Sequence, residues 1–295
     1  DFWAMIANPR GWYLIWHTVS SSLTTAGFFI LGISVYHLFR KNKVDFFQRS
    51  FRIGAIVGLS AAIMTGVSGH AQGVHLLDVQ PMTAAASEAH FETADPAPFK
   101  VIAGFDSTGK EEVWSWEIPK ALSWLYFFQP EGEVVGIDDI QEEYVELYGP
   151  GDYIPNVAVS FWSFRIMVGI GFLLVGLGAV AVWVDRKQYP EKSLKWLRWL
   201  IWAIPLPYLA NTFGWILTEV GRQPWVVQGL LLTSDAVSPN VPASSVWTSM
   251  ALFGLIYSVI LGITIALIMK YAKAGPASIE SKKSIDQESS AAAAA

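Results

Sequence analysis

Two side chains that can ligate a metal ion lie within long uncharged segments of the chain. His17 lies in the uncharged stretch from Gly11 to Phe39, and Met167 lies in the stretch from Ile166 to Val184. Imidazole and thioether together form a known axial pair for a six-coordinate haem iron that transfers electrons. The alternatives are a histidine that hydrogen-bonds a neighbouring helix and a methionine that fills the core. Small residues one turn away leave room for a flat macrocycle: Ser20 and Ser21 beside His17, Ser163 and Gly171 beside Met167.

Three charged residues accompany these candidates. Arg165 lies two residues before Met167 and requires an anionic partner, which could be a haem propionate, a quinone oxygen or Glu219. Glu219 and Arg222 have the i, i+3 spacing that permits an ion pair on one helix. Gly221 and Pro224 indicate that the helix ends at this point, so a cluster that caps the helix at the surface is the alternative role.

The remaining histidines give weaker signals. His37 adjoins Arg40 and is typical of a residue at the membrane interface. His70 and His75 are five residues apart and do not share a helical face, and either could line an outer cavity.

The composition is that of an integral membrane protein. Of the 295 residues, 53% are hydrophobic and only 15% are charged, whereas soluble domains carry about 25% charged residues. The 14 tryptophans suit a protein with two membrane–water interfaces. A net charge of −5 argues against a nucleic-acid partner. The absence of cysteine excludes disulfides, iron–sulfur clusters and thiolate ligands.

Uncharged runs predict an all-α bundle of five transmembrane helices. A bilayer core of about 30 Å requires roughly 20 apolar residues. Pro239 and Pro242 place the beginning of the last run outside its helix. The five runs cover residues 11–39, 53–77, 166–184 (reaching back to about 156 if Arg165 is tolerated), 199–218 and 236–269. We therefore divide the chain into two helices (1–77), a long loop (78–155), three helices (156–272) and a tail expected to be disordered (273–295).

The positions of the basic residues predict the orientation. Fourteen Lys and Arg residues lie in the segments around 40–52 and 186–198 and after residue 269, all of which fall on one side of a five-helix topology. The positive-inside rule assigns that side to the cytoplasm. The N-terminus and the long loop are then outside, and the C-terminus is inside.

The 78–155 loop is the only sizeable region expected outside the membrane. It contains 16 acidic residues against three lysines. Loops of this length without structure are uncommon and are often functional. Its first part, residues 79–90, is predicted to form a short helix near the surface.

Four blocks of sequence resemble subunit I of the cytochrome bd quinol oxidases. They occur in the family's order and extend over nearly the whole chain to about residue 275. The blocks are His17-Thr-Val leading to residues 29–34, Asp78-Val-Gln80, Phe164-Arg-Ile-Met167, and Gly214-Trp215 with Glu219 and the Gly-Arg-Gln-Pro-Trp run at 221–225.

The resemblance implies a bacterial membrane enzyme that oxidises quinol and reduces oxygen to water. It implies that His17 and Met167 ligate a low-spin b-type haem, with Arg165 beside it. It also implies that Glu219 binds at the site of a high-spin haem b and a haem d, near Trp215 and Arg222. Protons released outside and taken up inside would make the cycle charge-separating.

The loop corresponds to the family's quinol-oxidising loop. Glu88 falls where that loop has a quinol-interacting glutamate, close to Gln80. Thr83 stands where the best-known members carry a lysine, which is a departure in the quinol contacts. Family members have about nine helices, and the first four have no counterpart here. We therefore expect a C-terminal portion, which begins at Asp1 and holds the low-spin haem, while the other two haems require the complete subunit, together with a second subunit.

Two other functions fit parts of the pattern. A cofactor-free transporter would use Arg165 and Glu219 as a gating pair, although no inverted repeat is evident. A non-catalytic haem-bearing anchor would share His17 and Met167 but would not require the long loop. An optical spectrum and a quinol titration would distinguish these alternatives.

Overall fold

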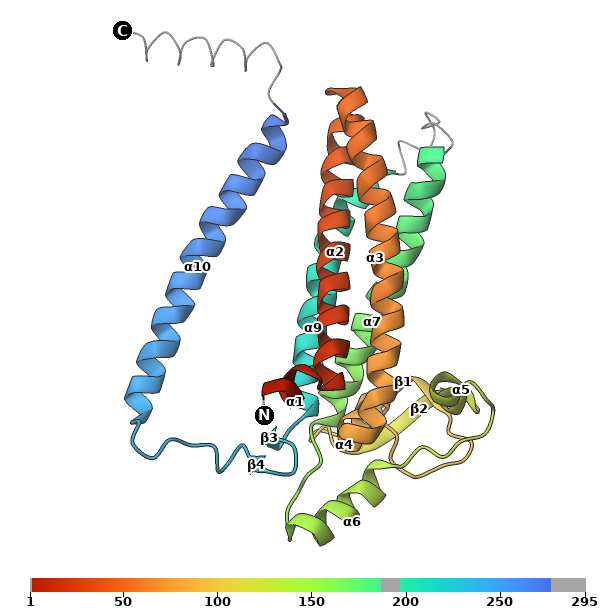
Figure 1. Cartoon of the computed structure of the whole chain (residues 1–295), viewed down its shortest axis with the longest axis vertical. Helices are drawn as coiled ribbons and strands as arrows, with labels where there is room; N and C mark the ends of the chain where they lie inside the picture. The colour runs from red at the N-terminus through yellow and green to blue at the C-terminus, as the bar shows by residue number, and fades with distance from the viewer. Residues whose placement is uncertain (1, 187–196, 277–295) are drawn as a thin grey trace. The chain divides into compact units, whose positions relative to one another are not determined.

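The computed structural model describes residues 2–186 and 197–276 and divides the chain into two units. The first unit is Asp1–Val237 and the second is Ser238–Ala295. The first unit contains a helical bundle with a small α/β region at one end, and the second contains one long helix, α10 (Ala243–Ala274) (Figure 1). The basic residues expected at 187, 192, 195, 282 and 283 lie outside the described residues, as does most of the predicted tail.

The five predicted membrane helices are confirmed in the described part of the chain. Five helical segments there are long and apolar enough to cross a membrane. Most extend beyond their uncharged runs, because a helix continues into charged turns that lie outside the apolar layer. A short helix, α1 (Phe2–Ile6), precedes them. In the first unit the spans are α2 (Pro9–Phe39), α3 (Val44–Val79), α7 (Val157–Arg186), and the 3₁₀ segment η1 (Arg198–Ala203) with α9 (Leu206–Gly221).

Prolines determine where several of these helices begin. Asn8 caps α2, and its side chain accepts a hydrogen bond from the Arg10 backbone N–H at 3.0 Å, with Pro9 in the first turn. The run predicted as one helix over residues 199–218 is divided into η1 and α9. Pro205 lies at the junction and has no N–H for a helical hydrogen bond.

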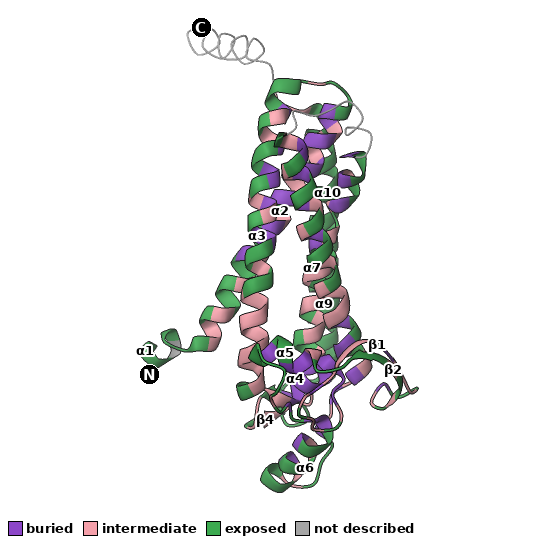
Figure 2. Cartoon of the chain, turned by 90° about the vertical axis from the view of Figure 1, so that its right-hand side faces the viewer, coloured by how far each residue is buried: buried purple, intermediate pink, exposed green. Residues whose placement is uncertain are grey.

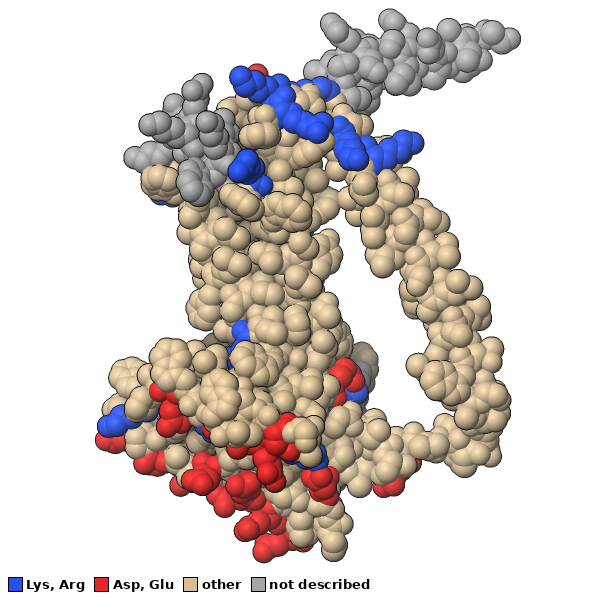
Figure 3. Space-filling view, turned by 180° about the vertical axis from the view of Figure 1, so that it is seen from behind, with Lys and Arg blue, Asp and Glu red and all other residues tan. Residues whose placement is uncertain are grey.

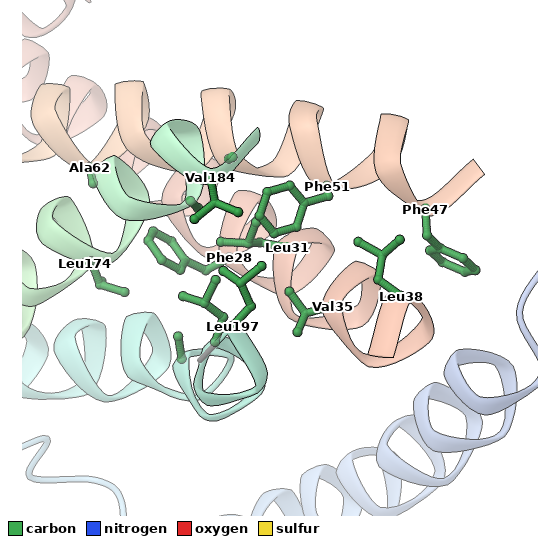
Figure 4. Packing of buried hydrophobic residues seen from close by; sticks show 14 residues of the cluster. Phe28, Leu31, Val35, Leu38, Phe47, Phe51, Ala62, Leu174, Val184 and Leu197 are labelled. Atoms are coloured by element: carbon green, nitrogen blue, oxygen red, sulfur yellow. The ribbon is translucent and has the colours of Figure 1, made fainter. Parts of the chain in front are cut away.

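The α2 and α3 helices pack closely through glycines. A Cβ added at Gly27 would lie 2.5 Å from the backbone of Gly58, so only glycine permits this approach. The buried core beyond this contact joins α2, α3, α7 and η1 (Figure 4). Phe28, Leu31 and Phe51 are completely buried in it. Burial of each such side chain is worth about 1.5–3 kcal/mol, so this half of the bundle is firmly held.

The 78–155 region is folded, with strands that the sequence analysis did not predict. A two-stranded antiparallel ribbon consists of β1 (Phe99–Phe105) and β2 (Glu112–Ile118). A second small ribbon, β3 (Trp225–Val227) with β4 (Leu231–Leu232), follows α9. The helices of the region are α4 (Pro81–Glu88), α5 (Ala121–Phe127) and α6 (Ile137–Tyr148).

The predicted helix within residues 79–90 exists as α4, but its placement near the surface was wrong. Seven of its eight residues are buried, and it contacts α3, α6, α7 and α9. The reason is its composition. Alanines at 84–86 permit close approach from several sides, and Met82 joins a core with Phe161 and Trp225.

Charge separates the two ends of the first unit. The connection between α2 and α3 carries Arg40, Lys41 and Lys43. The opposite end carries the acidic 78–155 region, where Asp and Glu crowd the surface (Figure 3). We call these the basic end and the loop end.

Candidate functional site

A buried ion pair joins the loop region to the helix bundle. Arg165 on α7 donates through Nη2 to Glu88 Oε2 at 2.6 Å. The Glu88 side chain is 2% exposed and that of Arg165 is 10% exposed. Arg165 also donates to the Lys100 carbonyl on β1, through Nε at 3.0 Å and Nη2 at 2.6 Å. One guanidinium therefore holds α4, α7 and β1 together.

One polar atom of each side chain in the Arg165–Glu88 pair makes no hydrogen bond among the described residues. Glu88 Oε1 and Arg165 Nη1 are buried and have no hydrogen-bond partner within the described structure. Burial raises the pKa of the Glu88 carboxyl, and the nearby Arg165 charge only partly opposes this. The rings of Phe99 and Phe161 lie 4.3 and 4.5 Å from the guanidinium carbon and exclude water from it.

An anionic partner for Arg165 was expected from the sequence, but Glu88 was not identified as that partner. The alternative partner, Glu219, was wrong: its carboxylate accepts from Arg222 Nη2 at 2.6 Å. That pair has the i, i+3 spacing noted from the sequence, and α9 ends at Gly221 as expected. The two side chains are 52% and 35% exposed, so the pair is far more accessible than the pair at Arg165.

The predicted quinol residues lie around the same end of the bundle. Thr83 is buried and donates to the Gly221 carbonyl at 2.9 Å, which joins α4 to the end of α9. Gln80 caps α3 and accepts from Arg10 Nη2 at 3.0 Å. Trp215 on α9 is 67% exposed, and no contact between it and Arg165 is found among the described residues.

His17 is held against α3 by a hydrogen bond. Its Nδ1 lies 3.3 Å from Ser68 Oγ, and a Cβ at Gly69 would lie 3.0 Å from the ring. The Ser68 hydroxyl is within donating distance of the Thr65 carbonyl at 3.2 Å. Because a carbonyl can only accept, this geometry favours Nδ1 as the donor to Ser68, and leaves Nε2 with the lone pair a metal requires.

Met167 projects from α7 toward α9. A Cβ at Gly214 would lie 3.0 Å from the Met167 sulfur, so the absence of a side chain at 214 makes room for the thioether. Both Met167 and His17 are half-buried rather than enclosed in the core. Nothing in the described structure therefore covers either candidate ligand completely.

The two candidate ligands lie at comparable depth in the bundle. A Cβ at Gly178 would lie 3.1 Å from Leu59, which fixes α7 against α3. From this contact, Gly69 beside His17 lies about 15 Å toward the loop end, and Met167 lies about 16 Å, at 1.5 Å per residue.

A second route through the bundle gives a larger difference. Asn211 on α9 donates to Thr25 on α2 at 3.4 Å. From that contact Gly214, beside Met167, lies about 4.5 Å toward the loop end and His17 lies about 12 Å. By these two routes the backbone positions of the two residues agree in depth to within about 8 Å, a difference that the lengths of the His17 and Met167 side chains would have to take up.

The helices around these residues lack a closely packed core. Buried residues gather in the basic half of the bundle and again around α4, and the level between them is half-buried (Figure 2). Ser68, Gly69 and Gly214 all lie at this level. The described residues include no fully buried one within 9–19 of α2, 63–79 of α3, 164–173 of α7 or 208–220 of α9. This loose packing, with an available Nε2 and a thioether, fits a flat prosthetic group.

Several contributors could not be found from sequence reasoning. Ser68 is 51 residues from His17 in the sequence and reaches it only because α2 and α3 pack together. Lys100 contributes its backbone carbonyl, which accepts hydrogen bonds from Arg165. Burial raises the pKa of the Tyr126 phenol on α5, and the charge of the nearby Glu88 carboxylate also raises it. Its place in the aromatic stretch 124–128 was the only signal.

The fold and the site together define a class of protein. This is a polytopic membrane protein in which an acidic, folded loop is fastened onto a helix bundle by a buried ion pair. The chain matches the family described as cytochrome bd terminal oxidase subunit I over residues 1–276. The chain belongs to this family.

Individual relatives agree with that assignment. The chain is 42% identical over 276 residues to cytochrome bd ubiquinol oxidase subunit 1 of Bacillus subtilis, covering 93% of this chain and 59% of that protein. It is 29% identical to cytochrome bd-II ubiquinol oxidase subunit 1 of Escherichia coli, covering 98% and 67%. The bd oxidase structure from Geobacillus thermodenitrificans matches with a TM-score of 0.76 at 26% identity, covering 92% of this chain and 60% of that one. The chain thus spans about three fifths of the Bacillus protein.

Proposed function

We propose that this chain supplies the quinol-oxidising and low-spin haem portion of a respiratory terminal oxidase in a bacterial cell membrane. His17 and Met167 would hold a b-type haem, which would supply a one-electron carrier. The observation that carries the proposal is the loosely packed level of the bundle, where a histidine with an available Nε2 and a half-buried methionine lie at comparable depth.

The residues at the loop end would handle the quinol. Glu88 Oε1 has no hydrogen-bond partner among the described residues, so it could accept a quinol hydroxyl proton. Burial raises the pKa of its carboxyl, which suits a group that takes up and releases a proton. Arg165 would fix the carboxylate, and Gln80 and Thr83 would shape the surroundings.

The rest of the cycle would require the complete subunit and a second subunit. There, Glu219, with Arg222 and Trp215 nearby, would contribute to the site of a high-spin haem b and a haem d, where oxygen is reduced to water. The loop and the N-terminus would lie outside and the C-terminus in the cytoplasm. The basic residues of the α2–α3 connection support that orientation.

The transporter alternative loses its specific support. A gating pair between Arg165 and Glu219 is not formed, since each of these residues pairs with another partner. A haem-bearing anchor without catalysis would not explain the buried carboxylate with a free oxygen at the loop end.

The test is a set of single variants in the complete enzyme. His17→Ala and Met167→Ala should each abolish the reduced-minus-oxidised signal of the low-spin b-type haem. His75→Ala, which removes a histidine near the loop end of α3, and Met64→Ala, which removes an exposed methionine of α3, should both retain it. Glu88→Gln should retain the signal but slow quinol oxidation. A normal low-spin spectrum in either ligand variant would refute the assignment.

A further inference from the structure

The β1–β2 ribbon and α5 carry an exposed apolar surface that lies close to the membrane helices. Ribbon and helix extend to the side of the bundle near the loop ends of α3 and α7 (Figure 1). We call this surface the lip. Its members are Ile102, Trp114, Trp116 and Ile118 of the ribbon and Trp124 and Phe128 at α5.

One face of the ribbon is covered around Ala103, and the other face carries exposed indole rings. Ala103 is buried and belongs to the core beneath the ribbon. Strand residues that face each other across the ribbon share a side, and Ile102 pairs with Trp116 on the opposite side from Ala103. The Trp114 indole lies across Gly104, where a Cβ would collide with it. Trp114 and Trp116 are 55% and 61% exposed, so the uncovered face is built of indole rings.

Helix geometry places the lip at the edge of the hydrocarbon layer. A 30 Å core takes about 20 helical residues. Counted from Ile53, the first residue after the charges at the basic end of α3, this core ends near residue 72. The Phe128 ring lies 5.3 Å from the His70 ring, which is at that level.

The α7 helix gives the same level independently. Counted back from Val184, the last residue before the charges at its basic end, 20 residues reach Arg165. Arg165 donates to the Lys100 carbonyl of β1 at 3.0 Å. Ribbon and α5 are therefore both attached to the bundle at the depth where lipid headgroups begin.

We propose that the lip is a membrane-interface anchor whose tryptophans lie in the lipid headgroup region at the loop end. Indole rings favour this zone because one part of the ring is apolar and its N–H can bond to water or headgroups. Charged residues are few along the spans of the first unit, whereas Asp and Glu crowd its loop end (Figure 3). The anchor would hold Lys100, and through it Arg165, at a fixed depth.

Spin labels on the complete enzyme in phospholipid nanodiscs can show whether lipid, water or protein contacts the lip. The chain has no cysteine, so Trp116→Cys or Ile118→Cys introduces its only labelling site. Signal from the unsubstituted enzyme is subtracted. Collision with oxygen, which concentrates in lipid, is compared with collision with a water-soluble nickel chelate. Glu117→Cys, on the same strand between the two lip positions, is the matched control because its side chain is exposed and points to the other side.

Labels at 116 and 118 should collide with oxygen several-fold more than with the chelate, and the label at 117 should show the reverse preference. Two results would overturn the proposal. Strong chelate collision at 116 and 118 would mean that the lip faces water. Weak collision with both reagents would mean that protein, either a second subunit or another part of the complete chain, covers it.

Discussion

Replacement of Arg165 by methionine would leave Glu88 buried without its cation. Met is of similar length and keeps the packing against Phe99 and Phe161, so the change removes mainly charge and hydrogen bonds. A 2%-exposed carboxylate cannot stay ionised alone, and it would take up a proton instead. Protonation sets the ceiling on the electrostatic cost.

That ceiling can be calculated. A Glu with an ordinary pKa of 4.5 requires about 3.4 kcal/mol to be protonated at pH 7, at 1.36 kcal/mol per pH unit. The Lys100 carbonyl also loses its donor, at about 1–3 kcal/mol. At pH 5 the electrostatic part falls to about 0.7 kcal/mol. Arg165→Met should therefore cost up to about 4–6 kcal/mol at pH 7 and clearly less at pH 5.

Burial raises the Glu88 pKa, so the folded protein binds this proton more tightly than the unfolded chain does. The stabilisation from the bound proton is complete below pH 4.5 and is lost as pH rises through the raised folded pKa. Removal of Arg165 raises that pKa further. The free energy of unfolding should therefore fall more steeply with rising pH than in the wild type, and the fall should continue to a higher pH.

The assay is thermal unfolding of the purified protein at pH 5, 6, 7 and 8, followed by tryptophan fluorescence. Arg52→Met removes an exposed arginine from its pair with Asp185 and should cost at most about 1 kcal/mol without a new pH slope. Adding Glu88→Gln to Arg165→Met should abolish the extra slope because the amide does not titrate. An Arg165→Met slope equal to that of Arg52→Met would refute the reasoning.

Two further substitutions test packing and hydrogen bonding, again by thermal unfolding. Gly27→Ala should destabilise by about 1–3 kcal/mol or more, because its Cβ meets the Gly58 backbone at 2.5 Å, whereas Gly66→Ala, with nothing within 4 Å, should be neutral or slightly stabilising. Equal effects of the two would contradict the close helix contact. Thr83→Val should cost about 1–3 kcal/mol, since the buried Gly221 carbonyl loses its donor; an unchanged melting temperature would show that this bond contributes nothing.

The membrane spans could be predicted from sequence because their signal is local. A run of uncharged residues identifies a helix without knowledge of its neighbours, and all five runs became helices. The fourth run is divided into η1 and α9 at Pro205, which is also a local feature of the sequence. A count of uncharged residues does not take this proline into account. The ribbon was missed because each strand is only seven residues long and its pairing depends on bulges at two positions.

The site was predictable in its residue types but not in its partners. The sequence pointed to Arg165 and Glu88 separately, but the pair spans 77 residues and depends on how α4 folds back onto α7. Thr83 was placed with the quinol contacts, whereas its hydroxyl is bound to the end of α9. Such contacts arise only when the elements are assembled, so no periodicity or spacing reports them.

The glycine contact between α2 and α3 has a consequence for biogenesis. Only the short segment of residues 40–43 separates the two helices, and Gly27 and Gly58 allow their backbones to meet directly. A pair of spans with so short a connection can leave the insertion machinery as one helical hairpin, already closed before the downstream chain has been synthesised. The imidazole of His17 would then be oriented early, on a preassembled half of the bundle that awaits the rest.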